Sequence, residues 1–209
     1  MTDVPFRCGA AILAAGASSR MGRAKTLLPW GSRTVISHLV GVYRDLTEPV
    51  VIVCRPDDLP LHAELDALGF PATNRIANPD AASGMYSSVR LALQWPGWRD
   101  RTTHLLLGLV DQPQILPMSI SRLLDAARRR PDRIIQPLHQ GRCRHPVLVP
   151  LTLAAPLADP TRYQTLREAL GDHQAQVFAL QLDDPGLSTD FDTPAQYDDA
   201  VKRFSANQP

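Results

Sequence analysis

The stretch Ala10-Ala-Ile-Leu-Ala-Ala-Gly-Ala-Ser-Ser-Arg-Met-Gly-Arg-Ala-Lys25 decides the fold class, because it joins an apolar run to a loop of small residues. The apolar run predicts a buried first strand. The Gly and Ala residues predict a loop at the carboxyl end of that strand, where backbone N–H groups can approach a polyphosphate closely. Arg20 and Lys25 are then placed to neutralise the charge of a triphosphate. An ordinary turn with solvated charges is the plainer alternative.

Lysine is rare in this chain. Of the 22 basic residues only Lys25 and Lys202 are Lys, and all the others are Arg. A compact charge on a flexible stem suits a phosphate ligand. The position of Lys25 inside the small-residue loop therefore favours phosphate binding there.

Apolar runs alternate with segments of helical period along the rest of the chain. Strands are expected at residues 7–14, 49–54, 73–77, 103–110, 133–137, 145–149 and 176–182, and helices at 34–46, 57–68, 83–95, 117–130, 162–170 and 194–204. Strands separated by helices imply parallel pairing with right-handed crossovers. We therefore expect residues 1–209 to form a single-domain, three-layer α/β/α Rossmann-like fold with a predominantly parallel sheet. Ligands of such sheets bind beyond the carboxyl ends of the strands.

Composition narrows the class of protein. The chain is 44% hydrophobic, has a net charge of +1, and contains three cysteines without a Cys-x-x-Cys pair or zinc spacing. No apolar run is long enough for a membrane span, and residues 1–7 lack the apolar stretch of a secretory signal. We expect a reduced, cytoplasmic protein that binds neither nucleic acid nor membranes.

One aspartate stands where a ligand cleft is expected, and a second lies at the predicted start of a helix. Asp111 directly follows the most hydrophobic strand, 103–110, and a carboxylate there is poised to bind Mg²⁺ together with phosphate oxygens. Capping of the following turn is the structural alternative. Asp192 precedes Thr193 and Pro194, which by themselves indicate the start of a helix with Thr193 as its cap.

The run from Leu13 to Lys25 matches neither G-x-G-x-x-G nor a Walker A loop, but reads Leu-Ala-Ala-Gly-x-Ser-x-Arg-Met-Gly-x-x-Lys. This signature resembles that of the MobA/MocA-like NTP transferases, and among them it is most similar to the molybdenum cofactor cytidylyltransferases. The resemblance covers residues 8–204 and implies a fold like that of the nucleotide-diphospho-sugar transferases. Further segments similar to the family's motifs begin at Asn78, Asp111, His145 and Asp190.

The resemblance assigns roles to individual residues. Lys25, Arg20 and Asp111 would be catalytic. Mg²⁺ would bind Asp111 and Asp192, with Asp190 as the weaker candidate for the second ligand. The nucleotide would contact Leu13, Ala14, Ala15, Gly16, Ser18, Arg20, Gly22, Lys25, Asn78, Gly84 and Ser88. A purely structural role for Ser88 is the equal alternative.

Gln112 and His145 would lie at the acceptor substrate, although a His before Pro is more often a structural residue. The chain departs from the family pattern at four places, which are Val110 in place of a Gly before Asp111, Arg144 in place of a Gly, Ala195-Gln196 in place of Glu-Asp, and Asp159-Pro-Thr-Arg162 where a Gly-Asp-x-Gly-Ala-Arg-like segment often stands. The last departure weakens the choice of acceptor more than the choice of reaction.

The resemblance implies a Mg²⁺-dependent nucleotidyltransferase that transfers a nucleoside monophosphate to a phosphate-bearing acceptor and releases pyrophosphate. The Leu-Ala-Ala-Gly sequence is similar to that of CTP users, and a molybdopterin cofactor is the first-choice acceptor. A sugar or polyol phosphate is the alternative acceptor, and a non-catalytic nucleotide- or cofactor-binding module is the alternative class. A hydride-transferring dehydrogenase is disfavoured because G-x-G-x-x-G is missing. The sequence leaves open whether the protein docks to an enzyme that receives the cofactor.

Overall fold

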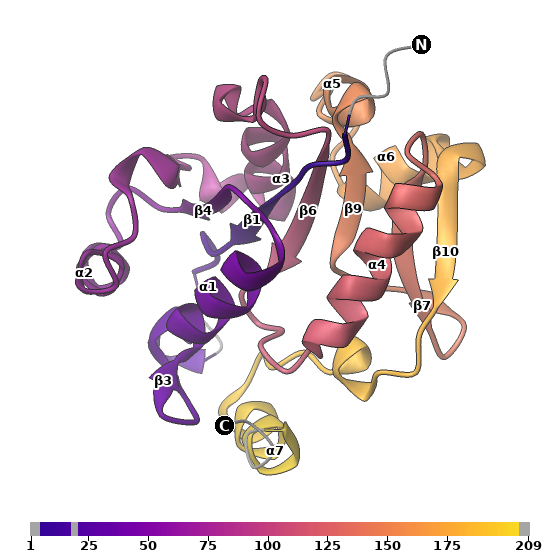
Figure 1. Cartoon of the computed structure of the whole chain (residues 1–209). Helices are drawn as coiled ribbons and strands as arrows, with labels where there is room; N and C mark the ends of the chain where they lie inside the picture. Colours follow the sequence, from indigo (N-terminus) through magenta and orange to yellow (C-terminus); the bar gives the residue numbers. More distant parts are fainter. Residues whose placement is uncertain (1–4, 18–20, 205–209) are drawn as a thin grey trace.

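The computed structural model describes residues 5–17 and 21–204, and its centre is a sheet with helices on both faces (Figure 1). The strands of this sheet are β1 (Cys8–Leu13), β4 (Val50–Cys54), β5 (Arg75–Ala77), β6 (His104–Leu109), β7 (Ile134–His139), β8 (Arg142–Cys143), β9 (Val147–Pro150) and β10 (Val177–Gln181). Their order is β10-β7-β9-β6-β1-β4-β5, and β8 pairs with β7. A separate hairpin joins β2 (Pro29–Trp30) to β3 (Arg33–Thr34).

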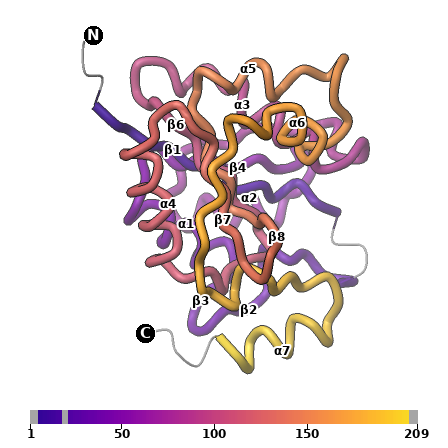
Figure 2. Tube along the Cα trace, turned by 90° about the vertical axis from the view of Figure 1, so that its right-hand side faces the viewer, coloured from indigo at the N-terminus to yellow at the C-terminus, as the bar shows by residue number. Residues whose placement is uncertain are grey.

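Helices cover the sheet in two layers. They are α1 (Val35–Leu46), α2 (Leu59–Ala67), α3 (Met85–Gln94), α4 (Pro117–Arg129), α5 (Ala154–Leu157), α6 (Leu166–Asp172) and α7 (Pro194–Phe204). The first core contains side chains of α1, α2, α4 and α7, and the second contains side chains of α3, α5 and α6. In Figure 2, α1 and α4 lie on one side of the sheet and α6 on the other. Successive side chains of β1 alternate between the cores, because neighbouring strand residues point to opposite faces.

The sheet is mostly parallel, as the alternation of strands and helices predicts. β1 pairs in parallel with β4 and β6, β4 with β5, and β10 with β7, whereas β9 is antiparallel to both β6 and β7. This exception arises because the chain returns from β7 through the short strand β8 and not through a helix. β1 and β6 end together, with Leu13 opposite Leu109, so the segments after them leave the sheet at the same edge.

The predicted strands and helices are present, with shifted ends. α1 begins where the sequence predicts, and Thr34 Oγ1 accepts a hydrogen bond from the Ser37 N–H (3.2 Å). α6 begins at Leu166, later than the predicted 162, because Thr165 and Glu168 form a capping box at that point. The sequence does not predict β2, β3, β8 or α5, whose two to four residues are too few to show a period.

No helix within residues 5–17 and 21–204 has both the length and the apolar character needed to cross a membrane. Cys8, Cys54 and Cys143 are free thiols, which agrees with their unpaired spacing in the sequence. Burial raises the pKa of the Cys54 thiol to about 11. This thiol therefore stays protonated and poorly nucleophilic near neutral pH.

A buried histidine makes the stability of this fold depend on pH. His104, at the start of β6, is 3% exposed, and its Nε2–H donates to the Pro131 carbonyl (3.0 Å). Burial lowers the pKa of His104 below its ordinary value of 6.5, and the contact with Pro131 opposes this only in part. The unfolded chain then binds the proton more readily than the folded protein does. The contribution of His104 to stability is therefore complete above pH 6.5 and is lost as the pH falls through the pKa of the folded state.

We expect the free energy of unfolding to fall more between about pH 7.5 and about pH 5.5 in the unsubstituted protein than in His104→Gln. One such group changes stability by at most about 1.4 kcal/mol per pH unit. The Gln side chain keeps a donor for Pro131 but does not titrate. Urea titrations at both pH values measure the difference, and equal pH dependence in the two proteins would contradict the prediction.

Candidate active site

A cavity of about 800 Å³ opens at the edge of the sheet where β1 and β6 end. Its walls come from the loop after β1, the segment after β4, the start of α3, the end of β6 and the segment before α7. The predicted site residues that line it are Leu13, Ala14, Ala15, Gly16, Gly22, Lys25, Gly84, Ser88, Asp111 and Asp192. The small-residue loop and Asp111 therefore share one cavity.

Three of the predicted site residues that the structure describes lie outside this lining. Asn78, Gln112 and His145 are described by the structure but do not line the cavity. Ser18 and Arg20 lie outside the described residues.

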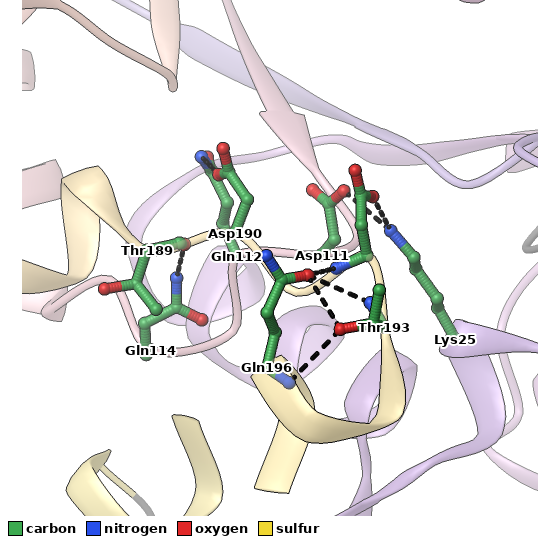
Figure 3. A network of polar contacts seen from close by, with 9 residues as sticks. Lys25, Asp111, Gln112, Gln114, Thr189, Asp190, Thr193 and Gln196 are labelled. Carbon is green, nitrogen blue, oxygen red and sulfur yellow. Dashed lines mark hydrogen bonds and ion pairs between the residues drawn. The ribbon is translucent and has the colours of Figure 1, made fainter. Parts of the chain in front are cut away.

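Lys25 joins two carboxylates from distant parts of the chain, and Figure 3 shows its ammonium directed toward Asp111. The Lys25 Nζ lies 3.1 Å from Asp111 Oδ2 and 2.7 Å from Asp192 Oδ1. The Lys25 side chain is 11% exposed, against 24% for Asp111 and 36% for Asp192. Charges that are shielded from water attract more strongly than charges on an open surface. We call these three side chains the lysine–aspartate cluster.

The acids of this region repel one another, and Lys25 offsets that repulsion. Burial raises the pKa of Asp111, whereas the Lys25 ammonium lowers it through its charge and its hydrogen bond. The nearby carboxylates of Asp190 and Asp192 raise the same pKa. Loss of the positive charge at Lys25 would remove the attraction that lowers the pKa of Asp111 and would leave the repulsion from Asp190 and Asp192.

The ring of Phe191 anchors the segment that carries Asp192. Phe191 is 0% exposed, stacks on Trp30 with ring centres 6.4 Å apart, and packs edge-on against Tyr197 at 5.5 Å. The Lys25 Nζ lies 5.8 Å from the centre of the Phe191 ring, which is within the range of a cation–π attraction. Phe191 therefore ties this segment to both β2 and α7.

Hydrogen bonds at the start of α7 fix the backbone at Asp192, and Figure 3 shows the contacts between Gln196 and Thr193 among them. Gln196 Oε1 accepts from the N–H groups of Asp192 (2.9 Å) and Thr193 (3.0 Å), and Thr193 Oγ1 accepts from the Gln196 N–H (3.4 Å). This reciprocal pattern is a capping box. Thr193 thus caps α7 as predicted, and Gln196 belongs to the pair that departs from the family pattern.

Asp190 has a different partner from Asp192. The Gln112 side-chain amide donates to Asp190 Oδ1 (2.7 Å). Asp190 does not line the cavity, whereas Asp192 does and pairs with Lys25. Of these two aspartates, Asp192 is therefore the one that lies at the cavity.

The turn after β6 is held from two sides. The Val110 N–H donates to the Leu13 carbonyl (3.2 Å), which ties the turn to the end of β1. From α1, the His38 Nε2–H donates to the Pro113 carbonyl (3.0 Å), and burial lowers the pKa of His38 so that its ring stays neutral. Asp111 lies between these two contacts and is held at the cavity.

Gly108 serves the packing of a helix and does not shape this turn. A Cβ at Gly108 would lie 2.0 Å from the Oη of Tyr43, which α1 presses against β6. Val110, which stands where the family carries a Gly, is 9% exposed and belongs to the core. The departure at Val110 therefore leaves Asp111 at the cavity.

His145 lies beside β6, outside the cavity lining. Its Nδ1–H donates to the Leu107 carbonyl over a long 3.4 Å. Burial lowers the pKa of His145. The contact with Leu107 and the negative charge of Asp190 oppose this shift. His145 and Gln112 thus share Asp190 as a neighbour.

Asn78 supports the α3 side of the cavity through hydrogen bonds, although it does not line the cavity itself. Asn78 is 1% exposed, and its Nδ2 donates to the hydroxyls of Ser87 (2.9 Å) and Ser88 (2.8 Å). Its Oδ1 accepts from the Asp80 N–H (3.0 Å), which fixes the loop before α3. Gly84, at the start of α3, has a φ of +111°, which favours glycine. Asn78 therefore supports Ser88, and Ser88 itself lines the cavity.

The sequence does not predict one wall of the cavity. Arg55, Asp57 and Asp58 follow β4 and line it. Arg55 Nε lies 3.4 Å from Asp57 Oδ1, and Asp58 caps α2 by accepting from the Leu61 N–H (3.3 Å). The sequence signal that could have identified these residues is the one that identifies Asp111, because they also directly follow the carboxyl end of a strand.

The lysine–aspartate cluster offers the oxygen ligands that Mg²⁺ prefers. Its two carboxylates converge on one ammonium, and Mg²⁺ usually takes one or two carboxylates together with phosphate oxygens and water. Across residues 5–17 and 21–204, no group of three or more His, Cys, Asp or Glu side chains is arranged to hold a metal ion. The residues present therefore fit a metal that is bound jointly with a phosphate ligand.

Comparison with known proteins identifies the family. Residues 10–183 match the family model of the MobA-like NTP transferase domain. The chain is 29% identical over 196 residues to the molybdenum cofactor cytidylyltransferase of Escherichia coli, which covers 93% of this chain and 95% of that protein. It is also 30% identical over 193 residues to nicotine blue oxidoreductase of Paenarthrobacter nicotinovorans, which covers 86% and 84% respectively.

Solved structures agree on the fold. Rv0371c of Mycobacterium tuberculosis superposes with a TM-score of 0.77 at 24% identity, over 94% of this chain and 99% of that one. Its complex with manganese superposes with a TM-score of 0.70 at 23% identity, over the same shares. These likenesses show the fold alone, and they confirm the expected nucleotide-diphospho-sugar transferase fold. Because the family match covers most of the chain, the protein belongs to the MobA-like NTP transferases.

Proposed function

We propose that this protein is a Mg²⁺-dependent nucleotidyltransferase that transfers CMP from CTP to a molybdopterin-type acceptor. The observation that carries the proposal is that one cavity contains both the small-residue loop after β1 and the lysine–aspartate cluster. A triphosphate needs backbone donors and cations, and a metal needs carboxylates beside that phosphate. The Escherichia coli relative, named a molybdenum cofactor cytidylyltransferase, supports the choice of nucleotide and acceptor.

In the proposed reaction, an oxygen of the acceptor's phosphate attacks the α-phosphorus of CTP in line. The bond from the α-phosphorus to the oxygen that bridges to the β-phosphate breaks, and pyrophosphate leaves. The attacking phosphate is already an anion at neutral pH, so the reaction needs no strong general base. The protein's contribution is then positioning and charge stabilisation.

Each part of the cavity has a role in this scheme. Lys25 would bind the α-phosphoryl oxygens, and Arg20, which lies outside the described residues, would hold the β- and γ-phosphates. Asp111 and Asp192 would hold Mg²⁺, which when bound supplies positive charge to the phosphates. The manganese complex of Rv0371c supports a divalent metal on this fold.

The nucleobase would lie against the backbone at the end of β1. Ala14 and Ala15 line the cavity but are 2% and 5% exposed, so their backbone would carry most of the contact. The Ala14 N–H already donates to the Val53 carbonyl (2.8 Å). Other backbone groups of the loop would therefore read the edge of the base.

A sugar or polyol phosphate is the second candidate acceptor. The segment 159–162, which stands where cytidylyltransferases often carry Gly-Asp-x-Gly-Ala-Arg, forms a turn outside the cavity lining. Asp159 Oδ1 accepts from the N–H (2.9 Å) and hydroxyl (2.7 Å) of Thr161, and Arg162 pairs with Asp172 (3.3 Å). This difference from the cytidylyltransferase segment supports the alternative acceptor.

Pyrophosphate release tests the reaction and the acceptor together. We expect release from CTP with Mg²⁺ and molybdopterin, and much less from GTP, ATP or UTP. Release only with a sugar or polyol phosphate would replace the acceptor. Thermal stabilisation by CTP without release would indicate a non-catalytic module. Redox turnover in the absence of nucleotide would instead favour an oxidoreductase, the class in the name of the Paenarthrobacter relative.

Lys25→Ala should leave the fold intact but slow turnover, because one preorganised cation is lost from the transition state. Loss of one such group costs about 3 kcal/mol, which corresponds to a roughly 150-fold lower kcat. The matched control is Lys202→Ala, which removes the chain's other lysine from an exposed position on α7. Nearly normal kcat in Lys25→Ala would rule out the role given to Lys25.

Gln196→Ala should raise the Mg²⁺ concentration needed for half-maximal activity, because the backbone at Asp192 loses the acceptor that fixes it. Loss of the capping box should also cost about 1 kcal/mol of stability. Gln196→Glu keeps an acceptor oxygen at this position and should restore most of both properties. If the Ala variant keeps the normal Mg²⁺ requirement, Gln196 does not position Asp192.

A further inference from the structure

Lys25 contacts both carboxylates that the proposed function gives to the metal. Its Nζ lies 2.7 Å from Asp192 and 3.1 Å from Asp111, so the ammonium stands where a shared cation would stand. We propose, on the basis of that function, that Lys25 is the resident counter-ion of the metal site. Nucleotide phosphate draws the ammonium away, and only then do the two carboxylates accept a metal ion.

Repulsion between like charges prevents the Lys25 ammonium and a divalent metal ion from occupying the two carboxylates at the same time. The Lys25 side chain is 11% exposed, and water screens its charge poorly at that depth. A divalent ion placed on the same two carboxylates would meet the ammonium at close range. Either the lysine leaves or the metal stays out. Free metal ions must therefore compete with a cation that is covalently part of the protein.

The triphosphate is the partner that releases the lysine. Lys25 lines the same cavity as the backbone of the loop after β1, so a phosphate bound by that loop lies along the same wall. Movement of the ammonium from carboxylate to phosphate exchanges one anionic partner for another. The two carboxylates are then left next to phosphate oxygens, which complete the ligand set of Mg²⁺.

The choice of lysine in an arginine-rich chain fits this exchange. An Arg can bind a carboxylate through two parallel hydrogen bonds and would hold the acids rigidly. A Lys carries a point charge on a flexible stem and can change partner more readily. This difference explains why position 25 carries a Lys in a chain in which 20 of the 22 basic residues are Arg.

Mn²⁺ binding in the absence of nucleotide tests the proposal. We expect Lys25→Met to bind Mn²⁺ at least about tenfold more tightly than the unsubstituted protein, because the competing cation is gone while the carboxylates remain. Lys202→Met is the matched control and should bind Mn²⁺ as the unsubstituted protein does. Electron paramagnetic resonance of free Mn²⁺ measures the affinity without any turnover.

The double variant Lys25→Met/Asp111→Asn separates a failure of the lysine exchange from a failure of the proposed metal site. It should lose the gain in Mn²⁺ affinity. Absence of any gain in Lys25→Met would overturn the exchange and leave the proposed reaction standing. A gain that persists in the double variant would show that the metal binds elsewhere, and would overturn the proposed metal site as well.

A second measurement needs no substitution in the site itself. The chain has two lysines, so its ammonium NMR spectrum has two side-chain signals, and Lys202→Arg assigns them. We expect CTP without metal to shift the Lys25 signal, and millimolar Mg²⁺ alone to leave it in place. Displacement of Lys25 by Mg²⁺ alone would overturn the proposal. Failure of CTP to bind at all would instead overturn the proposed function.

Discussion

The contact of one lysine with two aspartates is the interaction on which the site depends. Lys25 is 86 residues from Asp111 and 167 residues from Asp192 along the chain, yet its ammonium touches both. The parallel register of β1 and β6 brings Lys25 and Asp111 together, because both strands end at the same edge of the sheet. The buried ring of Phe191 and the cap of α7 then bring in the third. Two separate folding constraints therefore meet at one cation.

Local sequence signals predict the parts of the site that depend on strand ends. The apolar run before Ala14 and the strand before Asp111 are visible as periods and compositions, and both residues line the cavity. Contacts across the chain are not visible in this way. The brace from Asn78 to α3 and the approach of Tyr43 to Gly108 depend on packing between distant elements. The antiparallel β9 likewise depends on a short hairpin that shows no period.

The fold alone does not choose the chemistry. Two relatives are named a cytidylyltransferase and an oxidoreductase, although the chain is 29% identical to the first and 30% identical to the second. Function on a shared fold resides in particular side chains. In this protein the partly buried, three-membered charge cluster lies beside a loop suited to phosphate, and this favours nucleotidyl transfer over redox chemistry.

The most direct test is a crystal structure with Mn²⁺ and a non-hydrolysable CTP analogue, using the anomalous signal of manganese to locate the metal. The convergence of phosphate and metal on one cavity predicts a manganese peak bound by Asp111 and Asp192, with the triphosphate along the loop after β1. A nucleotide seated elsewhere, or a manganese peak away from both carboxylates, would contradict it.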